Sequence, residues 1–144
     1  MIVVDVETTG TEATAHSLLS IGAVDLNKPD RQFSGECRAW EGAHVSDEAL
    51  AVNGFNLEQV WDKSKKSEGD LVKEFLDWAT ASEDHTIAGM NPSFDNDFIK
   101  WACIRNKINF PLAHRTVDMH SVCYVHMIKN GDIPPLAKNR SNIN

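Results

Sequence analysis

The apolar positions of the first forty residues fall into three short runs separated by polar segments. Residues 1–6 and residues 18–26 ("LLSIGAVDL") are apolar enough to predict buried strands, and residues 31–39 alternate loosely between apolar and polar. The segment "NKPD" before the third run contains Asn, Pro and Asp, which favour a turn, and so predicts a hairpin. Together the three runs predict an antiparallel meander.

The rest of the chain combines helical periodicity with two brief apolar runs. Ser46, the acids after it and the terminating Asn53-Gly54 predict a short helix, and apolar residues on one face predict a packing helix over 71–79. Two strand–helix units follow, with strands expected at 86–90 and 116–117 and helices at 94–107 and about 118–129. This order predicts an α/β domain whose mixed sheet has three antiparallel strands followed by two short parallel strands, flanked by helices.

Composition narrows the class of protein. At 144 residues with 42% hydrophobic positions, the chain is long enough for one globular domain over residues 1–144. It has no run of about 18 apolar residues and no basic segment followed by an apolar core at its start, so we expect no membrane partner and a cytoplasmic location. The three cysteines form no C-x-x-C pair, which argues against a disulfide framework or a structural zinc site.

The net charge of −7 bears on nucleic-acid binding. It argues against a protein that coats long duplexes, because neutralisation of phosphates is the main source of that affinity. It is compatible with a nuclease that has an acidic metal site and holds a few nucleotides through local basic groups.

Two acids stand one residue apart at the end of the first predicted strand. Alternate residues of a strand project to the same side, so Asp5 and Glu7 are expected on one face with Cα atoms about 6.6 to 7 Å apart. Mg²⁺ and Mn²⁺ prefer oxygen ligands and would relieve the repulsion between these carboxylates. The alternative is a strand that simply leaves the core at Asp5. Asp95, in the first turn of a helix that follows a strand, is either a third ligand or an ordinary first-turn acid.

Three motifs resemble those of one enzyme family. The segments "DVETTG" at Asp5–Gly10, "GMNPSFDNDFI" at Gly89–Ile99 and "TVDMHSV" at Thr116–Val122 resemble the DEDDh family of 3′-to-5′ exonucleases, the DnaQ-like class with a ribonuclease H-like fold. The resemblance spans nearly the whole chain. It implies that the catalytic and metal-binding carboxylates are Asp5, Glu7 and Asp95, and that the residues around the terminal nucleotide are Thr8, Thr9, Gly10, Asn91 and Phe94.

The same resemblance implies a reaction and its requirements. The expected reaction is metal-assisted hydrolysis of the terminal phosphodiester bond by two Mg²⁺ or Mn²⁺ ions about 3.5 to 4 Å apart. The expected partners are the 3′ ends of single-stranded DNA or RNA, whose last bases stack on apolar and aromatic side chains.

One family motif is absent from the sequence. Family members carry His-x₄-Asp near the C-terminus, which supplies the general base and the fourth carboxylate, but none of the six histidines here is followed by an acid five positions later. The segment "LAKNRSNIN" at the end of the chain resembles the opening of the helix that leads to this motif. We therefore expect a truncated family member that lacks one or two C-terminal helices and is weak or inactive. The alternative is a non-catalytic domain of the same fold that binds nucleic-acid ends.

Three further features carry weaker expectations. Lys63, Lys65 and Lys66 are interpreted as a solvated loop, with a phosphate-binding track as the alternative. The four tryptophans are expected to be buried or half-buried. Because missing helices would leave apolar surface exposed, a homodimer is a further expected partner arrangement.

Overall fold

The computed structural model describes residues 1–132, and within them ten helices and strands. The segment 136–144, which we expected to open a further helix, lies outside the described residues. The elements in chain order are β1 (Ile2–Thr8), β2 (Leu18–Asp25), β3 (Lys28–Glu36), α1 (Asp47–Asn53), α2 (Leu57–Val60), α3 (Glu68–Thr80), β4 (Ile87–Gly89), α4 (Pro92–Arg105), β5 (Thr116–Asp118) and α5 (Met119–Lys129).

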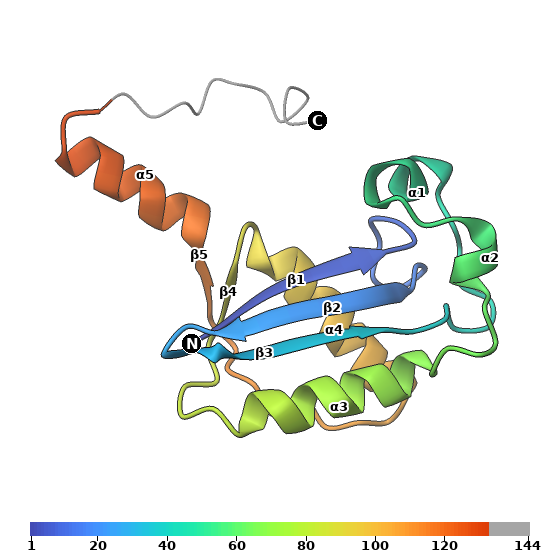
Figure 1. The fold of residues 1–144 in the computed structure, drawn as a ribbon. Coiled ribbons are helices and arrows are strands. Elements are labelled where there is room, and N and C mark those ends of the chain that lie inside the picture. Colours follow the sequence, from blue (N-terminus) through green and yellow to red (C-terminus); the bar gives the residue numbers. More distant parts are fainter. Residues whose placement is uncertain (133–144) are drawn as a thin grey trace.

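The strands form one mixed sheet in the order β3-β2-β1-β4-β5 (Figure 1). β1, β2 and β3 pair antiparallel, whereas β4 pairs parallel with both β1 and β5. The predicted fold class, a mixed sheet of three antiparallel and two short parallel strands, is confirmed. β1 lies at the centre, which places its two acids in the middle of the sheet.

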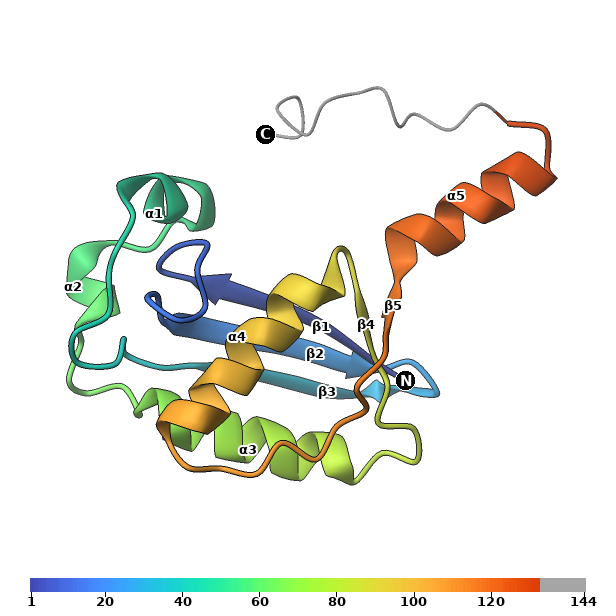
Figure 2. The same cartoon turned by 180° about the vertical axis from the view of Figure 1, so that it is seen from behind.

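Two helices cover one face of this sheet. Figures 1 and 2 show α3 and α4 on the same side, with α4 crossing the strands, while α5 projects away from the edge at β5. The side chains of Ile2, Val4 and Val6 are buried against α3 and α4 in the main hydrophobic core. Because side chains alternate along a strand, Asp5 and Glu7 project toward the opposite face.

Local signals explain where the helices begin and end. Ser46 caps α1 by accepting a hydrogen bond from the backbone of Ala49, and Gly54 closes the helix with a left-handed φ of 78°. The short α2, which the sequence analysis did not predict, has a capping box formed by Asn56 and Gln59. In residues 1–132, no helix has the length and apolar character needed to cross a membrane.

The hairpin turn differs from its prediction. The tight turn between β2 and β3 consists of Leu26 and Asn27, and Pro29 and Asp30 belong to β3. Lys28 pairs with Asp25 and Gln32 with Val24, so the residues between them bulge out of the ladder. β3 is an edge strand, and a proline is tolerated there because its missing N–H leaves no ladder bond unmade.

Candidate active site

The start of α4 meets the end of β1 through a hydrogen bond from a backbone N–H to a side-chain carboxylate. The N–H of Val6 donates to Oδ1 of Asp95 at 2.9 Å. β4 pairs only with Ile2 and Val3 of β1, so the edge of β1 beyond that point is open to a side chain from α4. This bond brings the Asp95 carboxylate to the strand position between Asp5 and Glu7.

The turn between β4 and α4 sets the position of Asp95. A Cβ atom on Gly89 would lie 2.8 Å from the carbonyl oxygen of Val4, so only glycine lets β4 approach β1 this closely. Asn91 follows with a left-handed φ of 58°, and Pro92 occupies the first turn of α4, where a missing N–H costs nothing. The helix therefore begins two residues earlier than predicted and directs Asp95 toward β1.

The three carboxylates differ in exposure and in pKa. Asp5 is exposed and Glu7 half-buried, whereas Asp95 is only 4% exposed. Burial, together with the charges of Asp5 and Glu7, raises the pKa of Asp95 to about 6, against the opposing effect of the Val6 hydrogen bond. Burial and the neighbouring Asp5 also raise the pKa of Glu7. The acids are thus close enough to disfavour one another's ionisation.

This donor set fits a hard divalent cation. Three carboxylates that repel one another gain from an ion that neutralises them, and Mg²⁺ and Mn²⁺ prefer oxygen ligands. In the part of the chain that the structure describes, no three His, Cys, Asp or Glu side chains are already arranged to hold an ion. Asp5, Glu7 and Asp95 would therefore adjust their side chains on binding a cation.

A pocket of about 350 Å³ adjoins Glu7. Its lining includes three of the predicted substrate residues, Thr8, Gly10 and Phe94, together with Val52 and other residues of α1. Val52 is 87% exposed, so the pocket presents apolar surface that a nucleobase could cover. The capping pattern predicted α1 as a helix but not its part in this pocket. The apolar Val52 just before Asn53-Gly54 was the available signal.

Two of the predicted substrate residues lie elsewhere. Thr9 is fully buried, and its hydroxyl donates to the carbonyl of His44 and accepts from the N–H of Ser17. Asn91 is exposed at the cap of α4, and its N–H donates to the Asp118 carboxylate at 3.3 Å. Neither residue lines the pocket beside Glu7. Thr9 therefore supports the loop after β1 from within the protein.

A buried ion pair also stabilises the loop after β1. Glu68, at the start of α3, is 2% exposed and receives hydrogen bonds from Arg105 at 2.7 Å and from the N–H of Leu18 at 3.2 Å. Arg105 in turn donates to the carbonyl of Ala13 at 2.8 Å. The pair links α3 and α4 to the segment 9–17, whose first residues face the candidate site. Sequence reasoning gave neither residue a role.

The family of the chain follows from its comparison with known proteins. Residues 2–132 match the RNase_T family model, which is described as exonuclease, and the chain belongs to this family. The predicted membership of the DnaQ-like 3′-to-5′ exonucleases is thereby confirmed.

Two curated relatives indicate the range of the family. The chain is 33% identical over 102 residues to the 3′-5′ DNA exonuclease Cap18 of Escherichia coli, a match that covers 68% of this chain and 54% of the relative. It is 26% identical over 120 residues to ribonuclease T of Histophilus somni (strain 129Pt), covering 74% of this chain and 55% of the relative. The chain thus spans about half the length of the curated relatives that it matches.

Solved structures share the fold. The zinc-bound form of the E. coli exonuclease I complex with single-stranded DNA superimposes with a TM-score of 0.72 at 15% identity, over 86% of this chain and 28% of that one. At this level of identity the likeness establishes the fold alone.

Proposed function

We propose that this chain is the exonuclease domain of a cytoplasmic enzyme that hydrolyses phosphodiester bonds at the 3′ ends of single-stranded DNA or RNA. The observation that carries the proposal is the bond from the Val6 N–H to Asp95, which brings a third carboxylate to a strand that already presents Asp5 and Glu7. Family membership supports the same reaction class, and the single-stranded DNA bound by exonuclease I supports the substrate class.

The three carboxylates would hold two Mg²⁺ or Mn²⁺ ions. When bound, such ions polarise the scissile phosphate and lower the pKa of the attacking water. The chain's own residues would place the substrate: the pocket beside Glu7 receives the terminal base against Val52 and Phe94, and Thr8 and Gly10 also line it. Asn53 donates from its side chain to the carbonyl of Thr8 at 2.9 Å, which keeps α1 against the end of β1.

We expect hydrolysis by the 144-residue chain to be slow. The sequence contains no His-x₄-Asp, the motif that supplies the general base and a fourth carboxylate in the family that the chain resembles. Loss of a general base typically lowers a rate by about 10²- to 10⁴-fold.

The test is Mn²⁺-dependent degradation of a 5′-labelled single strand. We expect a ladder of products shortened from the 3′ end, and its loss in the Asp5→Ala variant, whereas Asp30→Ala in the β3 bulge should behave as the parent does. Degradation that persists unchanged in Asp5→Ala would contradict the proposal. Tight binding of the strand without hydrolysis in either Mg²⁺ or Mn²⁺ would instead support the non-catalytic end-binding domain.

A further inference from the structure

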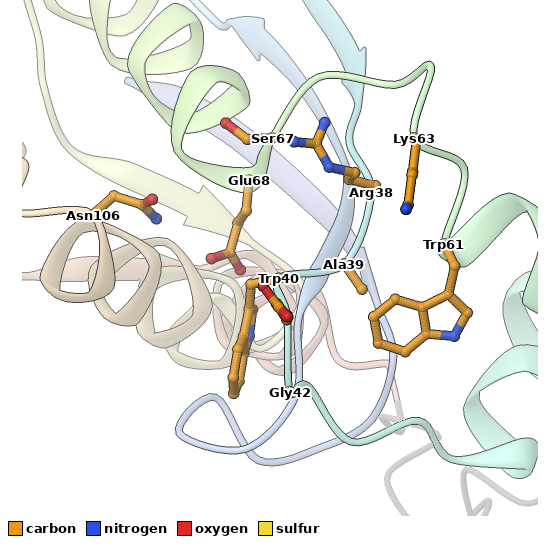
Figure 3. Close-up of a pocket in the computed structure, with 10 residues that line it drawn as sticks. Arg38, Ala39, Trp40, Gly42, Trp61, Lys63, Ser67, Glu68 and Asn106 are labelled. Carbon is orange, nitrogen blue, oxygen red and sulfur yellow. The ribbon is translucent and has the colours of Figure 1, made fainter.

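A second, larger cavity lies at the end of β3. It has a volume of about 510 Å³, and Arg38, Trp40, Trp61 and Lys63 are among the residues that line it (Figure 3). We call this cavity the Trp61 groove. β1 and β3 run in the same direction, because both pair antiparallel with β2. The groove follows the end of β3, so it lies at the same end of the strands as the carboxyl end of β1.

Trp61 offers an exposed ring on a fixed backbone. The neighbouring Val60 is fully buried, and its carbonyl accepts a hydrogen bond from the N–H of Ala39 at 2.9 Å. Trp61 is nevertheless 41% exposed, contrary to the buried or half-buried position expected for it. A large aromatic surface held open on an ordered segment is suited to stacking a base with little loss of conformational entropy.

Trp40 is a second ordered ring in the groove. Its indole N–H donates to the carbonyl of His16 at 3.3 Å, and the guanidinium of Arg105 lies 5.1 Å from its ring centroid. Both contacts fix the orientation of the ring. The groove therefore contains two aromatic side chains: the Trp40 ring is held by contacts of its own, and the exposed Trp61 side chain stands on an ordered backbone.

The groove also carries positive charge. Arg38 donates one N–H to the carbonyl of Lys65, and in the described part of the chain neither Arg38 nor Lys63 forms an ion pair. Of the two acids that line the groove, Glu68 is neutralised by Arg105 and Glu41 is exposed. In a chain of net charge −7, two cations without an acidic partner are a local attraction for phosphate.

The groove and the pocket beside Glu7 are connected by a short segment of chain. Gly42 lines the groove and Ser46 lines the pocket. Four residues span at most about 14 Å, because an extended chain advances about 3.6 Å per residue. A stacked strand advances about 3.4 Å per nucleotide, so at most about four nucleotides bridge this distance.

We propose that the Trp61 groove binds the single strand upstream of its 3′ end, with a base stacked on Trp61 and phosphates near Arg38 and Lys63. The inference rests on the proposed function, because the 3′ end is assigned to the pocket beside Glu7. It predicts an affinity that depends on the length of the strand.

The experiment measures binding of 5′-fluorescein-labelled oligothymidylates by anisotropy, with EDTA present to prevent hydrolysis. The groove variant is Trp61→Ala with Lys63→Ala. The control variant is Trp101→Ala with Lys129→Ala, which removes a ring of similar exposure, 39%, and one exposed lysine from α4 and α5.

We expect the groove variant to bind a strand of about twelve nucleotides at least about tenfold more weakly than the parent, and the control to change by less than about twofold. For a strand of two nucleotides, which advances only about 3.4 Å and stays within the pocket beside Glu7, we expect the groove variant to match the parent. The salt dependence of binding should also fall by about one phosphate contact in the groove variant.

The inference would be overturned if both double variants bound the long strand with equal affinity. It would also be overturned if the groove variant bound short and long strands equally more weakly than the parent, which would indicate a mononucleotide site. If Trp61→Ala fails to fold, Lys63→Glu at an exposed position replaces it. This variant should weaken the binding of the long strand and leave the binding of the short strand unchanged. The degradation assay separates the two proposals. Degradation that persists in Asp5→Ala, together with a groove variant that still loses long-strand affinity, refutes the exonuclease proposal only. Asp5-dependent degradation with no groove effect refutes the inference only.

Discussion

The surroundings of Asp95 oppose the ionisation of its carboxyl group. Its pKa of about 6 lies above the ordinary value of 3.8, because burial and the charges of Asp5 and Glu7 oppose ionisation. A raised carboxyl pKa stabilises the fold fully below the unfolded value, and this stability is lost as the pH rises through the folded value. For Asp95 the loss runs from about pH 4 to beyond about pH 6 and amounts to about 2–3 kcal/mol.

The Asp95→Asn variant should therefore be more stable than the parent where Asp95 is charged. An asparagine oxygen can still accept from the Val6 N–H, so we expect a free energy of unfolding about 2 kcal/mol higher at about pH 8 and no difference below about pH 4. Urea unfolding at several pH values measures this. Asp97→Asn, at an exposed position two residues away, is the control and should show no such trend. A variant less stable than the parent at about pH 8 would contradict the argument.

The sequence predicted these acids better than it predicted their neighbours. Strand alternation alone put Asp5 and Glu7 on one face, and the first-turn position of Asp95 was confirmed. Thr9 could not be placed in the same way. Its burial depends on Ser17 and His44, which are 8 and 35 positions away, and no local pattern indicates such contacts.

The apolar periodicity of α3 predicted the residues on its buried face but not the burial of its first residue. All five apolar residues expected on its inner face, Leu71 among them, are buried. No local pattern indicates that its first residue, Glu68, is buried as well, since an acid in the first turn of a helix is ordinary. Its burial follows from Arg105, which lies 37 positions away on α4.

Removing this buried pair should cost more than removing an exposed pair of the same helix. We expect Glu68→Gln to lower the free energy of unfolding by about 2–4 kcal/mol, because it leaves the Arg105 charge without a partner. Glu74→Gln removes an ion pair to Lys66 in which the Glu74 side chain is 53% exposed, and should cost less than about 1 kcal/mol. Equal losses in urea unfolding would show that the Glu68 pair is not a support of the loop.

For the whole molecule, α5 is the element with the least support. It has no buried residue, and Val122, Val125 and Ile128 are each at least 50% exposed on one side of the helix. Exposed apolar surface of this kind favours association. The order of strands and helices was predictable from the sequence, whereas the direction in which α5 leaves the sheet was not, because none of its residues is buried against the rest of the described chain.

We expect this chain to form a homodimer through α5. Light scattering after size-exclusion chromatography should give a mass near twice 16.0 kDa at high concentration, and Val125→Asp should shift it toward the monomer. Ile104→Asp, on α4 and 61% exposed, is the matched control and should leave the dimer intact. A parent chain that is monomeric at every concentration would contradict the expectation.

The hydrogen bond from Val6 to Asp95 joins positions 89 residues apart, whereas the β1–β2–β3 meander is local in sequence. Contacts of large sequence separation require costly loop closure, so the meander is expected to form early in folding and the docking of α4 late. The repulsion among the three acids then arises after the rate-limiting barrier. Neutralising one of them should slow unfolding and leave the folding rate nearly unchanged. This expected order of folding would keep an electrostatically unfavourable cluster from hindering the formation of the sheet that carries it.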